Sequence, residues 1–223
     1  MDKKLWLIWK EPIKKRNYII GILEYKKNRY FFKYVDPELN DARKSGLTNF
    51  PGFDVINKVY ESVEMFSNIE VRLPNKGRPD YLDILNMYDL DIYSTKMEIL
   101  KNTNGKLLTD NFSFVPVFNE NKIEFEVVGI QYRNGINEVK NELVKNSSIV
   151  IERDEKNEYD KYAIRVLFKN NHLGFIPRYY SKQVSELMKK SVRYSAKVKN
   201  ITKERTINNE ERVRLFVRII FEK

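Results

Sequence analysis

Three blocks of sequence decide the fold of the C-terminal half of this chain: FEVVGIQYRNG at residues 125–135, ERDEKNEYDKYAIRV at 152–166 and HLGFIPRYYS at 172–181. The first block alternates as a β-strand does, and we predict a strand that ends at Gly135. The third block leads from a short strand into a helix, which we expect to begin at Ser181. These blocks predict a unit with both strands and a helix.

Further alternating segments complete the predicted sheet. They are SSIVIERD at 147–154, YAIRVLF at 162–168, RYSAKVKNI at 193–201 and RVRLFVRIIFEK at 212–223. The last two should pair as a hairpin around Ile207–Glu211. The simplest closure is a small, mostly antiparallel β-barrel crossed by one helix. With helices and strands segregated, the fold class of the whole chain is α+β, and we divide it into domains at 1–119 and 120–223.

In this order and at this spacing, the three blocks resemble the HIRAN domain. This family occurs alone in bacterial proteins and at the front of eukaryotic helicase-like ATPases, where it grips the 3′ end of single-stranded DNA. The resemblance implies that residues 120–223 form a nucleic-acid-binding module for single-stranded DNA, with no catalytic residues. RNA, and single-stranded DNA bound without regard to its end, stay open as ligands.

The resemblance also implies a pocket for the strand end, built from the tip of the first strand, the loop EKNEYDKYA at 155–163 and the GFIPR turn at 174–178. There, the ring of Tyr159 would stack on a terminal base and Asp160 would accept a hydrogen bond from a free 3′ hydroxyl. Asn157 belongs to the same loop. The remaining residues implied for this pocket, most of them as phosphate contacts, are Tyr132, Arg133, Phe175, Arg178 and Lys182.

Two features of this pocket admit another interpretation. Asn157 and Asp160 fit equally well in an Asx-type turn, where their side chains bond backbone amides. Members of the family that bind DNA ends often carry an arginine and two aromatic residues where this chain has Gln131, Tyr132 and Arg133, and Phe175 stands at a position where a polar residue would help to hold a phosphate.

A second set of candidate residues lies on the last two strands. Side chains alternate across a strand, so Arg212, Arg214 and Arg218 share one face, with Lys197 and Lys199 of the neighbouring strand nearby. We expect this row of cations to face water. It predicts either a phosphate track or a charged surface that discourages aggregation between strands.

Charge and composition limit the possible functions. The net charge is +10, and residues 121–223 hold 22 basic and 14 acidic residues, a net of +8, which favours an anionic partner such as nucleic acid. The chain has no cysteine and a single histidine, His172, which we expect in an exposed turn, so no metal or other cofactor is predicted. A nuclease using Asp154, Glu155, Glu158 and Asp160 around a divalent cation is the remaining enzymatic alternative.

No apolar run approaches the ~20 residues that span a bilayer, and the opening segment is too polar for a secretory signal. We therefore expect a cytoplasmic protein without a membrane partner.

The first half of the chain predicts a hairpin sheet with helices. Residues 18–23 and 30–35 read as a hairpin with Asn28 in its turn, and 38–45 as a helix. We predict a helix at 55–70, with Val55, Val59, Val63 and Phe66 on one face. A second helix should begin at Pro79 and point Tyr81, Leu82, Leu85 and Tyr88 inward. A third should begin at Thr95, where Glu98 completes the cap, and end before Gly105.

This half resembles, more faintly, the N-terminal portion of HipA-type kinases of bacterial toxin–antitoxin modules. The matching segments are FFKY at 31–34, MFSNIEVRLPNKGRPDYLDILNMY at 65–88 and MEILKNTNGKLLTDNFSFVP at 97–116. The kinase lobes and a Gly-rich phosphate loop are missing from the sequence, so no kinase activity is predicted. The resemblance implies a HipS-like regulatory subunit that restrains a separate HipA-type kinase, in a toxin–antitoxin or phage-defence module.

Overall fold

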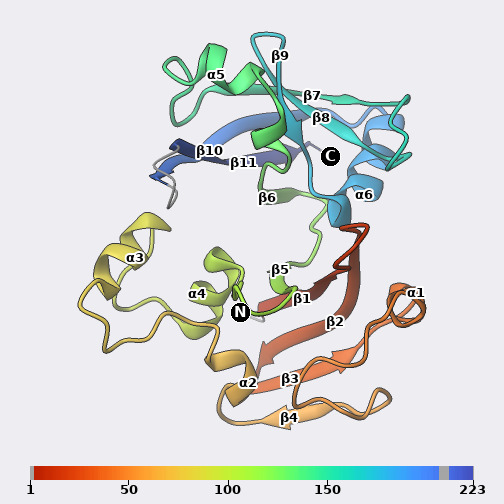
Figure 1. Ribbon diagram of the computed structural model, residues 1–223, viewed down its shortest axis with the longest axis vertical. Helices are drawn as coiled ribbons and strands as arrows, with labels where there is room; N and C mark the ends of the chain where they lie inside the picture. The colour runs from red at the N-terminus through yellow and green to blue at the C-terminus, as the bar shows by residue number, and fades with distance from the viewer. Residues whose placement is uncertain (1–2, 206–210, 223) are drawn as a thin grey trace. The chain divides into compact units, whose positions relative to one another are not determined.

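The computed structural model describes residues 3–205 and 211–222; for 203–205 and 211–212 it describes the backbone alone. The turn predicted around Ile207–Glu211 lies outside the described residues, apart from the backbone of Glu211. The chain divides into two compact units, Met1–Val117 and Phe118–Lys223. Each unit has its own antiparallel sheet and its own buried core (Figure 1).

The first unit is built on a five-stranded sheet in the order β4-β3-β2-β1-β5, in which every pair is antiparallel. Its strands are β1 (Lys3–Lys10), β2 (Asn17–Lys26), β3 (Arg29–Tyr34), β4 (Tyr60–Ser62) and β5 (Phe112–Pro116), and its helices are α1 (Glu38–Lys44), α2 (Ser67–Glu70), α3 (Tyr81–Met87) and α4 (Lys96–Thr103). The predicted hairpin is confirmed: β2 and β3 are joined by Lys27 and Asn28, both with positive φ, as a tight two-residue turn requires.

Aromatic side chains fill the core of the first unit. Phe32 of β3 is fully buried and stacks on Phe53 with ring centroids 4.1 Å apart. The Tyr34 hydroxyl donates a hydrogen bond to the Phe53 carbonyl and accepts one from the Phe50 N–H, both at 2.8 Å. These two bonds fasten the loop at residues 49–53 to the sheet, so its two phenylalanines reach the core.

The predicted helix at 55–70 is wrong. The segment contains the short edge strand β4 and the single helical turn α2, and Val55, Val59 and Val63 are exposed. The Tyr60 hydroxyl accepts a hydrogen bond from the Val55 N–H at 2.7 Å, and Tyr60 pairs with Phe32 across the sheet. Sheet pairing therefore replaces the local periodicity, and β-branched valines favour that outcome.

The helix predicted from Pro79 is shorter and less buried than expected. It is α3, which begins at Tyr81, and of the four residues expected to point inward only Leu85 is buried, while Leu82 is exposed. Figure 1 shows α3 on an extended excursion of the chain between α2 and α4. The spacing of apolar residues by three and four positions therefore predicted the helix correctly, but it did not predict how much of the helix is buried.

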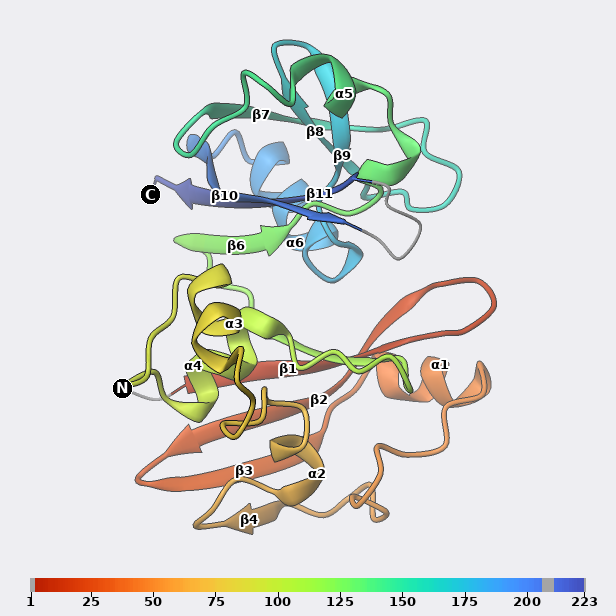
Figure 2. The same ribbon diagram turned by 60° about the vertical axis from the view of Figure 1, so that its left-hand side comes forward.

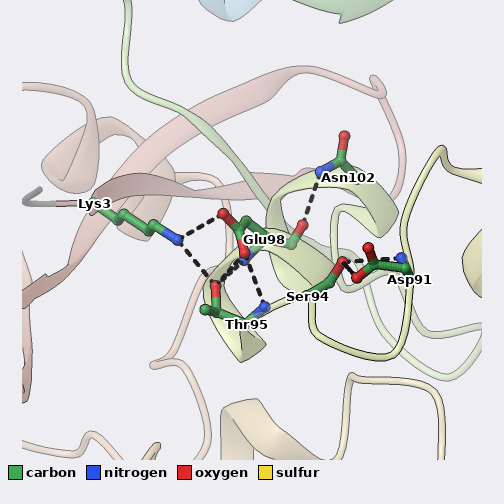
Figure 3. Close-up of polar contacts among 6 residues, drawn as sticks. All are labelled: Lys3, Asp91, Ser94, Thr95, Glu98 and Asn102. Carbon is green, nitrogen blue, oxygen red and sulfur yellow. Dashed lines mark hydrogen bonds and ion pairs between the residues drawn. The ribbon is translucent and has the colours of Figure 1, made fainter.

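The prediction for α4 is confirmed in detail (Figure 3). The Thr95 hydroxyl accepts from the Glu98 N–H at 3.3 Å, and the Glu98 carboxylate accepts from the Thr95 N–H at 2.8 Å, which forms a capping box. Lys3 adds an ion pair with Glu98 at 2.9 Å and so joins β1 to the start of this helix. The helix ends at Thr103, and Asn104 in the left-handed region caps it before Gly105.

This capping box predicts an acid-sensitive first unit. Hydrogen bonds from Lys3 and then Thr95 lower the pKa of Glu98 from 4.5 to about 2. Because the folded pKa lies below the unfolded one, the contribution to stability is complete above the unfolded value and is lost as the pH falls through about 2. Urea unfolding of the first unit between pH 5 and 2 should show this loss, and Glu98→Gln should reduce the pH dependence. An unchanged pH dependence in the variant would contradict the assignment.

The second unit is a curled, six-stranded antiparallel sheet in the order β6-β11-β10-β7-β8-β9 (Figure 2). Its strands are β6 (Lys122–Glu126), β7 (Ser148–Arg153), β8 (Ile164–Phe168), β9 (Asn171–Phe175), β10 (Tyr194–Arg205) and β11 (Glu211–Phe221), and its helices are the 3-10 turn η1 (Ile130–Tyr132), α5 (Gly135–Val139) and α6 (Arg178–Lys189). Two hydrogen bonds between Val128 and Phe175, at 3.0 and 2.9 Å, join the two edges of the sheet at one end. The result is a half-barrel with Tyr180 and Val184 of α6 buried in its core.

Two predicted boundaries in this unit are wrong. The first strand ends at Glu126 instead of Gly135, because Gly129, at φ 79°, turns the chain into η1 and α5. Gly135 itself passes so close to β9 that a Cβ would lie 2.6 Å from the His172 carbonyl oxygen. The helix α6 begins at Arg178, directly after Pro177, and not at Ser181.

Within the described residues, no helix is long and apolar enough to cross a membrane.

Candidate nucleic-acid interface

The loop between β7 and β8 is held by its own side chains. The side-chain Oδ1 of Asn157 accepts from the backbone N–H groups of Tyr159 and Asp160, both at 3.0 Å. Asp160 accepts from the Tyr162 N–H at 2.9 Å with one carboxylate oxygen and from the Ser181 hydroxyl at 2.8 Å with the other. Asn157 and Asp160 therefore take the Asx-turn role that the sequence left open, and Asp160 also fastens the loop to α6.

This loop presents an aromatic ring to solvent. The side chain of Tyr159 is 87% exposed. The backbone carbonyl oxygen of Tyr159 accepts a long hydrogen bond of 3.5 Å from the guanidinium of Arg178, in the first turn of α6. Lys182 follows four residues later, on the same side of the helix, and is exposed. A rigid loop with an outward ring and adjacent cations suits stacking on a base next to a phosphate.

A second aromatic and basic group lies where η1 passes β9. The Arg133 guanidinium lies over the Phe175 ring, 5.2 Å from its centroid, and His172 packs edge-on against the same ring at 4.7 Å. Tyr132, the neighbour of Arg133, is 77% exposed. Phe175 thus acts as a platform for the arginine, which explains an aromatic residue at a position where a polar one was expected.

The expectation of an exposed turn for His172 is wrong. His172 lies on β9, is half-buried, and its Nε2 is 3.0 Å from the Gly174 carbonyl oxygen. Burial, followed by the nearby charge of Arg133, lowers the pKa of His172. The imidazole is therefore neutral at pH 7 and adds no charge to this surface.

Sequence reasoning missed one cation at this position. Arg165 of β8 pairs with Phe175 in the sheet register, and its guanidinium bonds Glu152 of β7 at 2.8 Å. Arg165 sits in the alternating segment YAIRVLF, so its side chain was predictable on the outer face of the sheet. Its position beside Phe175 depends on the pairing of β8 with β9, which includes a bulge.

The two groups are connected through the chain from Phe175 to Arg178. We call the surface formed by Tyr132, Arg133, Tyr159, Phe175 and Arg178 the aromatic–basic surface. Its members come from η1 and the residue that follows it, the β7–β8 loop, β9 and the start of α6.

Cations on the last two strands pair with acidic side chains, which corrects the expectation of a row of cations that face water. Arg214 of β11 bonds Glu126 through two nitrogens, at 2.8 and 3.1 Å. Lys199 of β10 and Arg218 of β11 both bond Glu124, at 2.9 and 2.7 Å. Lys197 is exposed and pairs with Arg218 in the register, while the side chain of Arg212 lies outside the described residues.

Three acidic residues of the β7–β8 loop have separate partners. Asp154 accepts from Asn157, Glu155 pairs with Arg153, and Asp160 is engaged as described above. Among the residues that the structure describes, no group of three histidine, cysteine or acidic side chains could hold a metal ion.

Comparison with known proteins agrees with the resemblance of this half. Residues 121–219 match the family model of the HIRAN domain, which confirms the prediction for this part of the chain. Two solved structures are similar to it, both at 23% identity. The crystal structure of the HIRAN domain of human HLTF has a TM-score of 0.35, with 45% of this chain and 74% of that chain covered. The crystal structure of a protein from Lactobacillus plantarum has a TM-score of 0.34, with coverage of 44% and 91%. No curated protein matches the chain.

Proposed function

We propose that the second unit binds single-stranded DNA through the aromatic–basic surface. A HIRAN domain suggests single-stranded DNA as the ligand. The observation that carries the proposal is the combination of the exposed Tyr159, whose backbone is bonded by Arg178, with the stack of Arg133 on Phe175. Rings that stack on bases, with cations between them, are the elements from which sequence-tolerant single-strand sites are made.

Recognition of the 3′ end is a finer proposal. A carboxylate oxygen has two lone pairs, and each oxygen of Asp160 has one known donor. The carboxylate can therefore accept a further hydrogen bond from a free 3′ hydroxyl beside the base stacked on Tyr159. A 3′ phosphate would be repelled by the same carboxylate.

We also propose that the unit is a binding module without catalysis. Of the loop carboxylates that a metal-dependent nuclease would need, Asp154, Glu155 and Asp160 are engaged with different partners. Incubation of a labelled single strand with the protein and Mg²⁺ or Mn²⁺ should leave the strand intact. Metal-dependent cleavage that co-purifies with the protein and is lost in Asp160→Ala would overturn this proposal.

Salt dependence tests the phosphate contacts. Each single-strand phosphate that a cation neutralises contributes about −0.7 to the slope of log affinity against log salt concentration. Arg133→Ala and Arg178→Ala should each make this slope shallower by about 0.7, as measured by fluorescence anisotropy. Arg78→Ala, at an exposed arginine of the first unit, is the matched control and should leave the slope unchanged. Equal slopes in all three variants would exclude these contacts.

A second function is proposed for the first unit, as a HipS-like subunit that binds and restrains a HipA-type kinase. The observation that favours it is the segment at 78–95, in which Leu85 is the one buried side chain and Leu82, Ile92 and Tyr93 are exposed. A HipA-type kinase without its own N-terminal portion should co-purify with the native protein, and Leu82→Ser with Ile92→Ser should abolish this. Retention of the kinase by the double variant would exclude this surface, and no co-purification with the native protein would exclude the function.

A further inference from the structure

Three cations converge on one carboxylate on the outer face of the second sheet. Lys122 and Arg218 bond Oε1 of Glu124 at 2.9 and 2.7 Å, and Lys199 bonds Oε2 at 2.9 Å. The Glu124 side chain is only 14% exposed. Burial alone would raise its pKa, but hydrogen bonds from Lys122 and Lys199 and the neighbouring Arg218 lower it to about 2. The carboxylate is thus ionised at any physiological pH.

The cations come from three adjacent strands, so their positions are fixed by the sheet. Lys122 belongs to β6, Lys199 to β10 and Arg218 to β11, and Arg218 is directly opposite Glu124 in the β6–β11 register. Donors that approach both oxygens of an anion from different directions are also what binds phosphate. We name these three residues the three-cation site. Glu124 occupies the place that an oxyanion would take there.

The same face holds a second internal pair, between Glu126 and Arg214. Glu124 and Glu126 are two residues apart on β6, so both point outward. Without them, the described side chains of β6, β10 and β11 would leave five cations on this face: Lys122, Lys197, Lys199, Arg214 and Arg218. Such a surface would bind any polyanion, regardless of bases or ends.

We propose that Glu124 is a specificity-determining residue: it fills the three-cation site and so prevents the outer face of the sheet from binding nucleic-acid phosphates. Nucleic acid is then confined to the aromatic–basic surface. This confinement rests on the proposed function, whereas the occupancy of the three-cation site does not. A phosphate that approaches the face meets a fixed negative charge, and each of the three cations already points a donor at Glu124.

Glu124→Gln tests the proposal, because it removes the charge and keeps the shape. The probe is inorganic tripolyphosphate, which has neither base nor 3′ end, titrated calorimetrically at low salt. We expect the variant to bind it at least about fivefold more tightly than the native protein, the effect of one unit charge at about 4 Å even in water. Glu124→Gln with Arg218→Ala should return the affinity toward the native value. An affinity unchanged or lowered by Glu124→Gln would overturn the proposal.

The first unit offers a matched control. Glu24 pairs with Lys4 and Lys26 at 2.9 and 3.0 Å, and its side chain is 17% exposed. Glu24→Gln removes the same charge but leaves only two cations, so it should raise tripolyphosphate affinity by less than Glu124→Gln does. A gain equal to that of Glu124→Gln would show a general charge effect and overturn the proposal. If Glu124→Gln does not fold, Glu126→Gln makes the same test at Arg214, with the same expected gain.

Single-stranded DNA separates this inference from the proposed function. A labelled strand should bind Glu124→Gln more tightly and with less effect of a 3′ phosphate, because the opened face accepts internal phosphates. If the native protein binds no strand while Glu124→Gln gains tripolyphosphate affinity, the proposed function fails and the three-cation site stands. If the native protein binds strands and the variant gains nothing, the three-cation site fails alone.

Discussion

Replacing Tyr159 with alanine should weaken the binding of single-stranded DNA by about 5- to 150-fold, because stacking of one base on an aromatic ring contributes about 1–3 kcal/mol. Tyr159 is 87% exposed, and the loop is held by Asn157 and Asp160 rather than by the phenol. The free energy of unfolding should therefore change by less than about 0.5 kcal/mol, as for other surface substitutions. Fluorescence anisotropy gives the affinity, and urea unfolding gives the stability.

The chain provides a control for this substitution. Tyr93 in the first unit is 85% exposed, so Tyr93→Ala removes an equally accessible ring from a surface for which no DNA contact is proposed. Its affinity for the strand should equal that of the native protein. If both variants lose affinity equally, or neither does, Tyr159 is not a stacking residue.

Replacing Phe32 with alanine should destabilise the first unit by about 3–5 kcal/mol, the usual cost of truncating a buried aromatic side chain. Phe32 is fully buried, stacks on Phe53 and contacts the Phe50 and Tyr34 rings. A loss of this size is a large part of the 5–15 kcal/mol that stabilises a typical domain. The stacked partners would lose their packing together with the side chain.

The effect should be restricted to one unit, since the chain divides into two compact units. Calorimetry should show one transition at a lower temperature and a second transition unchanged, and single-stranded DNA binding should persist. Val63→Ala, at an exposed position in the same unit, should shift neither transition. A single transition that moves as a whole in Phe32→Ala, with DNA binding lost, would show that the units fold as one.

Local chemistry made some elements predictable. The turn at Lys27–Asn28, the capping box of Thr95 and Glu98 and the pairing of the last two strands all depend on residues close in the sequence, whose geometry follows from backbone sterics and hydrogen-bonding capacity. The HIRAN resemblance was predictable for a related reason: its blocks keep both order and spacing.

Long-range pairing was not predictable. At 55–70 the valines have a helical spacing, but the segment forms a strand because Tyr60 pairs with Phe32, a residue almost thirty positions away in the chain. The same limit applied to the basic row on β11. Arg214 and Arg218 were placed correctly on one face, but their neutralisation depends on Glu126 and Glu124, about ninety residues earlier, and on the register of β6.

The candidate site was predictable in part. Turn chemistry predicted the Asx-turn role of Asn157 and Asp160, the HIRAN resemblance implied the ligand role, and the structure favours the turn role. The stack of Arg133 on Phe175 could not be inferred, because Gly129 ends the predicted strand and redirects the chain. Aromatic rings and cations that are scattered in the sequence meet there only after the sheet has curled.

The most direct test of the central proposal is fluorescence anisotropy of a labelled single strand of about 10 nucleotides, with a free 3′ hydroxyl or a 3′ phosphate, across a salt series. The proposal predicts binding at low salt that weakens as salt rises and that is tighter for the 3′ hydroxyl. Equal affinity for the two strands would reject end recognition and leave single-strand binding in place. No binding of either strand at low salt would contradict the proposed function.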